Sequence, residues 1–350
     1  MRPEQAFFLF ICVIVLFFLG IEISEHIPLE PYKLFNNASD HLGKSIPDSD
    51  VKKNAMLHSN KNGVSRTLQQ LPSQSPDLLR TPLLTKIKCS QRYRLLIMVT
   101  TRPDDFERRS NIRSTWGGTW HQRTDLPLWK TIFQLGLSNN YQVWNKTVDE
   151  AVKHRDMIFG NFTDNFFKLP VKVIMGFEWA TRYCNFDFLL KADDDVFVNI
   201  PNVFKFLSEP DIPRHKLYAG NVHFQTEAIR FRHPKYYVNI LEYPYRKYPR
   251  FTSGGGMVFS RDVVAGMVNI HNNSNYFKLD DVYIGMLALR LGVDAHHDDW
   301  FQLFKGANDC KCEEKTIVRH GAENKDCMEK LYNCFPNLYE NYAGFVIKEK

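Results

Sequence analysis

The sequence predicts an α/β fold with a mostly parallel central sheet that is covered by helices. Between residues 93 and 192, short apolar segments of strand length alternate with segments that suit helices. The last of these apolar segments ends in three consecutive aspartates. Ligands of such sheets bind beyond the carboxyl ends of the strands, so this acidic end marks the expected functional site.

The expected elements follow one another along the chain. Strands are expected at residues 93–100, 129–136, 156–159 and 186–192, and helices at residues 107–116, 150–155 and 166–183. The third helix is predicted because its apolar residues recur close to a helical period. After residue 220 the alternation becomes less regular, and we expect a substrate-covering lobe on the same sheet.

Length and charge limit the class of protein. The 350 residues, 44% of them apolar, are enough for one large domain or two small ones. The net charge of +6 comes from dispersed basic residues with no long Lys/Arg block, which disfavours a nucleic-acid partner. A mildly basic surface suits an anionic substrate such as a nucleotide diphosphate.

The N-terminus predicts a membrane anchor. Residues 6–21 form an uncharged apolar run of sixteen residues, preceded by Arg2 and followed by three glutamates. This favours a transmembrane signal anchor at 6–23 with a cytosolic tail at 1–5. A cleaved signal peptide is the alternative, but no clear small-x-small cleavage site follows. Residues 24–88, rich in polar residues and proline, predict a flexible stem before a lumenal domain at 89–350.

Cysteines and sequons agree with an oxidising lumen. Six cysteines follow the stem, which allows up to three disulfides in fifteen possible pairings. A zinc site among the last four is the weaker alternative, because their spacing does not fit the usual ligand pairs. Four N-glycosylation sequons begin at Asn37, Asn145, Asn161 and Asn272.

The aspartate triplet is the strongest candidate for a metal site. In an extended segment residues i and i+2 point to the same side, so we expect Asp193 and Asp195 to face one cation and Asp194 to face away. Carboxylates in an open site suit Mg²⁺ or Mn²⁺, with substrate phosphates completing the coordination shell. The alternative is an acidic turn that caps the next helix.

Three further segments have residues suited to chemistry. Gly254–Gly256 precede an apolar strand and would form either a wall against a sugar or phosphate, or a tight turn or bulge. Asp280 and Asp281 begin an amphipathic segment, where one could act as a general base and either could cap the helix. His320 ends a short apolar strand; it is either a structural histidine or a third metal ligand.

Taken together, these segments resemble the β-1,3-glycosyltransferase family, glycosyltransferase family 31, and most closely its brainiac-type branch. The resemblance extends over roughly residues 90–335. The matching segments are Arg109–Gly117, Lys172–Trp179, Lys191–Asn199, Ala219–Phe224, Glu242–Pro249, Gly254–Gly256, Asp280–Gly285 and Val318–His320.

The resemblance implies a GT-A fold, a UDP-sugar donor, a divalent cation (usually Mn²⁺, or Mg²⁺) and inversion at the anomeric carbon. It assigns Asp193 and Asp195 to the DxD motif, with Asp195 as the firmer metal ligand and Asp193 nearer the ribose. His320 matches the metal-binding histidine. Asp281, and not Asp280, matches the acid assigned as the general base.

The same resemblance suggests which residues bind the nucleotide sugar. One family motif near the nucleotide pocket matches a segment of this chain that contains an arginine and a tryptophan. Two residues of the acidic triplet and the three glycines are the other expected donor-binding residues. The expected donor-binding residues are Arg113, Trp116, Asp193, Asp194, Gly254, Gly255 and Gly256.

The resemblance also predicts the setting. A short tail, an anchor and a stem are typical of a single-pass type II Golgi enzyme that extends a glycan on a glycoprotein or glycolipid. Ala192 and Asp194 stand where many galactosyl-transferring members have threonine and serine, which favours UDP-N-acetylglucosamine slightly over UDP-galactose. The alternatives are an inactive membrane-anchored lectin or chaperone on the same fold and a lumenal metal-dependent hydrolase, which usually needs a denser ligand set.

Overall fold

The computed structural model describes residues 87, 89, 91–118, 128–231, 235–271, 275–304 and 310–335. The expected tail, anchor and nearly all of the stem lie outside these residues, as do the sequons at Asn37 and Asn272. Within the described ranges, no helix combines the length and the apolar character needed to cross a membrane.

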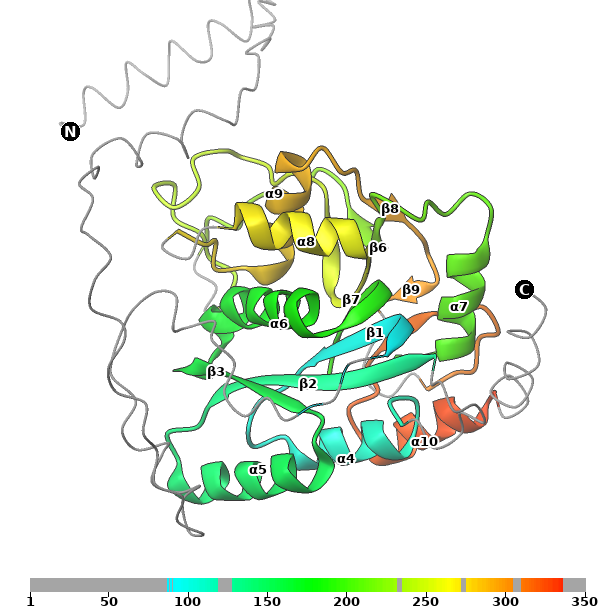
Figure 1. Ribbon diagram of the computed structural model, residues 1–350. Helices are drawn as coiled ribbons and strands as arrows, with labels where there is room; N and C mark the ends of the chain where they lie inside the picture. Colours follow the sequence, from blue (N-terminus) through cyan, green and yellow to red (C-terminus); the bar gives the residue numbers. More distant parts are fainter. Residues whose placement is uncertain are drawn as a thin grey trace, which may run out of the picture. The chain divides into compact units, whose positions relative to one another are not determined.

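A seven-stranded mixed sheet forms the centre of the fold, in the order β3-β2-β1-β4-β7-β6-β8 (Figure 1). The strands β3, β2, β1 and β4 run parallel, as the alternating sequence predicted. β7 is antiparallel to both of its neighbours, β4 and β6, so the sheet is not parallel throughout. The strands span Arg92–Thr100 (β1), Trp129–Leu137 (β2), Met157–Thr163 (β3), Asn185–Asp193 (β4), Tyr218–His223 (β6), Phe251–Ser260 (β7) and His296–His297 (β8).

A smaller sheet of three strands follows the acidic end of β4. It consists of β5 (Val196–Val198), β10 (Val318–His320) and β9 (Phe301–Gln302), with β10 in the middle. β5 and β10 are antiparallel, and His320 is paired with Val196. This pairing brings a histidine more than a hundred residues away in sequence next to the aspartate triplet.

Helices cover both faces of the large sheet (Figure 1). One core cluster contains Phe177, Val264 and Leu287 from the helices α6, α8 and α9. The other contains Ile112 and Met328 from α4 and α10. The helices span Phe106–Ser114 (α4), Tyr141–His154 (α5), Leu169–Tyr183 (α6), Ile200–Ser208 (α7), Arg261–Ile270 (α8), Asp280–Arg290 (α9) and Lys325–Asn333 (α10), with a 3-10 turn at Phe166–Lys168 (η2).

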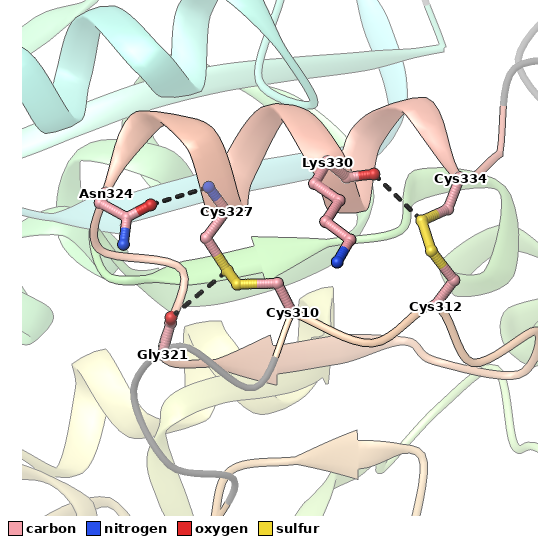
Figure 2. Close-up of a disulfide and its surroundings, with 7 residues drawn as sticks. All are labelled: Cys310, Cys312, Gly321, Asn324, Cys327, Lys330 and Cys334. Carbon is pink, nitrogen blue, oxygen red and sulfur yellow. Dashed lines mark hydrogen bonds between the residues drawn. A yellow bond between two sulfur atoms is a disulfide. The ribbon is translucent and has the colours of Figure 1, made fainter.

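Three disulfides use all six of the cysteines that follow the stem, which confirms the disulfide prediction over zinc. They join Cys89 to Cys184, Cys310 to Cys327, and Cys312 to Cys334. Figure 2 shows that the last two attach both ends of α10 to the segment at residues 310–312. The Asn324 side chain accepts a hydrogen bond from the Cys327 amide at the start of this helix.

Candidate functional site

The centre of the candidate site is the carboxyl end of β4. Asp193 is the last residue of the strand and is paired in register with Thr100, the last residue of the parallel strand β1. The Thr100 hydroxyl donates a hydrogen bond to the Asp193 carboxylate. The buried ammonium of Lys191 lies 2.6 Å from the same Asp193 oxygen. Asp193 is thus held at the strand end by two donors.

The three aspartates point in three directions. Asp193 faces Lys191, whereas Asp194 accepts a hydrogen bond from Arg108 of α4 at 2.8 Å. Asp195 lies beside His320, with 3.5 Å between a carboxylate oxygen and the imidazole Nε2. The described partners of Asp193 and Asp195 thus differ, and the expectation that both face one cation remains a prediction.

Asp195 and His320 have the geometry of a partial cation site. One Asp195 oxygen faces the imidazole, while the other is buried and has no hydrogen-bond partner among the described residues. Burial opposes ionisation, but the adjacent imidazole holds the pKa of Asp195 below its usual value. An ionised oxygen without a donor is what a divalent cation requires. Within the described ranges, no three such side chains converge on one point, and the expected trio with Asp193 remains a prediction.

A second acidic group lies at the start of α9. Asp280 and Asp281 occupy its first turn, and Leu279 is the N-cap residue, without a side-chain cap. Asp281 accepts a hydrogen bond from the Val282 amide at 2.7 Å, so part of its role is that of a helix-terminal acid. Burial, with repulsion from Asp280, raises the pKa of Asp281 to about 7. A carboxylate with this pKa is suited to accepting a proton near neutral pH.

Gly254 lies between the two acidic groups. A Cβ atom at this position would be 3.7 Å from the Lys191 ammonium, 3.7 Å from an Asp280 oxygen and 3.8 Å from the Asp281 Cβ. Gly255 and Gly256 face the small sheet instead, where a Cβ at Gly256 would be only 2.9 Å from Val318. The β6–β7 register also shifts beside the glycines, which supports the bulge interpretation.

Arg113 and Trp116 have the contacts of core residues. Arg113 binds Asp156 through two nitrogens, at 2.7 and 2.9 Å, and also pairs with Glu150. Trp116 is completely buried. The motif that contains them therefore forms part of the α4 packing, and their expected contact with a nucleotide remains a prediction.

Two cations of the site were not predicted from the sequence. Lys191 could have been found, because it lies two residues before Asp193 on the same face of β4. Arg108 gave no comparable signal, since its pairing with Asp194 joins segments that are 86 residues apart. Arg108 also lines a cavity of about 490 Å³ together with Asp104, Asp105, Glu107, Gly321, Glu323 and Asn324.

Comparison with known proteins agrees with the motifs. A family model described as "Galactosyltransferase" matches residues 107–299. The Homo sapiens lactosylceramide 1,3-N-acetyl-beta-D-glucosaminyltransferase is 36% identical over 217 residues, which cover 59% of this chain and 57% of the relative. The protein of the same name from Xenopus tropicalis is 33% identical over 260 residues, with coverages of 71% and 68%.

Among solved structures, the mannosyltransferase PcManGT from Pyrobaculum calidifontis, in complex with GDP-Man and Mn²⁺, is similar over 63% of this chain and 59% of that chain. Its TM-score is 0.34 and its sequence identity is 14%.

The acidic groups at the end of β4 and at the start of α9 agree with the sequence relatives, which place this chain in a family of glycosyltransferases. The chain belongs to the galactosyltransferase family, the family of β-1,3-glycosyltransferases that its motifs resemble. It spans little more than half the length of the human relative.

Proposed function

We propose that this chain is an inverting, metal-dependent β-1,3-glycosyltransferase that moves a sugar from a UDP-sugar to the 3-hydroxyl of a glycan acceptor. The observation that carries the proposal is the approach of two acidic groups from different elements, which meet across Gly254 and Lys191. One group suits a cation-bound diphosphate, and the other suits an acceptor hydroxyl.

The donor we propose is UDP-N-acetylglucosamine. Ala192 and Asp194 support this choice, because galactosyl-transferring members often have threonine and serine there. The human and Xenopus relatives are both named as N-acetylglucosaminyltransferases that act on lactosylceramide, which adds support for this donor and for a glycolipid or glycoprotein acceptor. UDP-galactose is the second candidate.

On the donor side, Asp195 and His320 would hold Mn²⁺ or Mg²⁺, and Asp193 would lie nearer the ribose. The bound cation would offset the negative charge that develops on the departing UDP. Asp195 contributes an ionised oxygen that has no other partner among the described residues. The Arg108 guanidinium pairs with the neighbouring Asp194.

On the acceptor side, Asp281 would accept the proton of the 3-hydroxyl as that oxygen attacks the anomeric carbon. The new glycosidic bond forms as the bond to UDP breaks, and a single in-line displacement inverts the configuration. No carboxylate nucleophile is needed, in contrast to retaining glycosidases. The absence of a side chain at Gly254 leaves space beside the Asp280 carboxylate and the Cβ of Asp281.

We further propose a single-pass type II Golgi membrane protein with its catalytic domain in the lumen. The apolar run at residues 6–21 supports this location, and the three disulfides agree with an oxidising compartment.

UDP release by the full-length chain in detergent with Mn²⁺ tests the function. UDP-N-acetylglucosamine, UDP-galactose and UDP-N-acetylgalactosamine are supplied separately with a panel of glycan acceptors. Acceptor-stimulated release from UDP-N-acetylglucosamine alone is expected. UDP release that does not depend on an acceptor would favour a hydrolase. If the protein neither binds UDP in the presence of Mn²⁺ nor releases UDP from any donor, a lectin or chaperone would be favoured.

A further inference from the structure

Lys191 is a buried cation that connects the two acidic groups of the site. Its side chain is 1% exposed. The ammonium contacts the Asp193 carboxylate at 2.6 Å, the Gly254 carbonyl oxygen at 2.6 Å and an Asp280 oxygen at 3.4 Å. These three partners come from β4, β7 and α9, so one atom joins the three elements that build the site.

This arrangement fixes the charge of Lys191. Burial of an unpaired ammonium group is costly, but two carboxylates, those of Asp193 and Asp280, contact the Lys191 ammonium. A buried charge is tolerated only when it is paired and hydrogen-bonded. The side chain therefore has a defined position, and the groups that contact it are held in place in turn.

We infer that Lys191 is a positioning residue that sets the distance between the donor-side carboxylates and the general base. Asp280 precedes Asp281 in the first turn of α9, so the contact between Lys191 and Asp280 anchors the end of the helix that carries the base. On the opposite side, the same ammonium orients Asp193 at the end of β4. This inference rests on the proposed transferase function.

Lys172 of α6 provides a matched control. It is also a lysine that is 1% exposed, and its ammonium contacts one carboxylate, Asp164, at 2.8 Å and one carbonyl oxygen, that of Thr101, at 2.8 Å. Lys172 differs from Lys191 in touching neither acidic group among its described contacts. A general effect of removing a buried lysine would therefore appear equally in both variants.

The kinetic test compares Lys191→Met with Lys172→Met in the full-length chain. Lys191→Met is expected to lower kcat about 100-fold, because a displacement of about 1 Å between reacting groups has an effect of this size. It is also expected to shift the pH midpoint of kcat upward, since the cation near Asp281 is lost. Lys172→Met should lower the unfolding temperature without either change. Equal kcat losses in the two folded variants, or a folded Lys191→Met with unchanged kcat, would overturn the inference.

A second test needs no catalytic activity. Asp193→Asn and Asp280→Asn are compared singly and together by thermal unfolding. The double variant should lose more stability than the two single losses added, because only the double variant leaves the buried ammonium without a carboxylate. In the Lys191→Met background each substitution should instead raise the unfolding temperature. The inference would be refuted if the effects of Asp193→Asn and Asp280→Asn on the unfolding temperature were additive and had the same sign in the wild-type chain and in the Lys191→Met background. This outcome can be read even if the wild-type chain proves inactive and the proposed function fails.

Discussion

Two clusters of charged side chains among the described residues differ in the balance between positive and negative charges. The first, here called the paired cluster, joins α4 to α5 and to the residue before β3. It contains two arginines and two acids, Arg109, Arg113, Glu150 and Asp156. The second, here called the acidic centre, contains five carboxylates and two permanently charged cations. Its members are Asp193, Asp194, Asp195, Asp280, Asp281, Lys191 and Arg108.

The difference separates structural from chemical roles within one set of family motifs. In the paired cluster every charge has an opposite partner, and Arg109 is completely buried, so the cluster holds two helices together. In the acidic centre carboxylates outnumber cations, and one Asp195 oxygen has no partner in the described part of the chain. Excess buried negative charge is costly unless a ligand offsets it, so the imbalance indicates the functional site.

The largest expected effect is on transfer by Asp281→Asn. The amide cannot accept the hydroxyl proton, so we expect kcat to fall about 10³-fold, within the range for loss of a general base. Mn²⁺-dependent UDP binding should persist, because Asp281 is not among the expected metal ligands. Steady-state kinetics and titration calorimetry measure the two quantities. Undiminished transfer would remove the assignment of Asp281 as the base.

Asp195→Ala should act on the donor side. Loss of the ionised oxygen beside His320 is expected to abolish Mn²⁺-dependent UDP binding, and with it transfer. The unfolding temperature of the metal-free protein should fall only slightly, since the variant removes the partly exposed pair between Asp195 and His320. Calorimetry with UDP, with and without Mn²⁺, is the measurement. Unchanged metal-dependent binding would show that the cation site lies elsewhere.

The sequence predicted the position of the site better than its internal geometry. The strand expected at 186–192 is β4, and its acidic end lies at the carboxyl edge of the sheet as predicted. The direction of Asp195 could not be predicted, because it depends on the turn after Asp193 and on the pairing of β5 with β10. Pairing between strands so distant in sequence leaves no local pattern.

The contacts of Arg113 could not be predicted from the sequence for the same reason. A motif identifies which residues recur together, but the partners of Arg113 lie about forty residues later in α5 and before β3. The disulfides illustrate the limit as well, because six cysteines set the maximum number of bridges and only the fold selected the pairing.

In the paired cluster, Glu150→Gln should affect stability and leave the chemistry intact. Glu150 contacts both arginines, and removal of its charge leaves the fully buried Arg109 underpaired. We expect a loss of about 3 kcal/mol in the free energy of unfolding, measured by urea denaturation. The kcat of the folded protein should be unchanged. Glu329→Gln, which removes an exposed pair with Lys325, is the control and should change stability by less than about 0.5 kcal/mol.

The smallest expected effect is the dependence of transfer on pH. Burial raises the pKa of Asp281 to about 7, so the carboxyl group is protonated below that pH and cannot act as a base. The kcat should therefore be nearly constant above pH 8 and fall about tenfold for each unit below pH 7, as expected for a single ionisation. A rate profile over pH 5–9, with UDP binding measured at each pH, separates the base from the donor site. A midpoint near the usual aspartate pKa would mean that the catalytic carboxylate is one with less burial than Asp281.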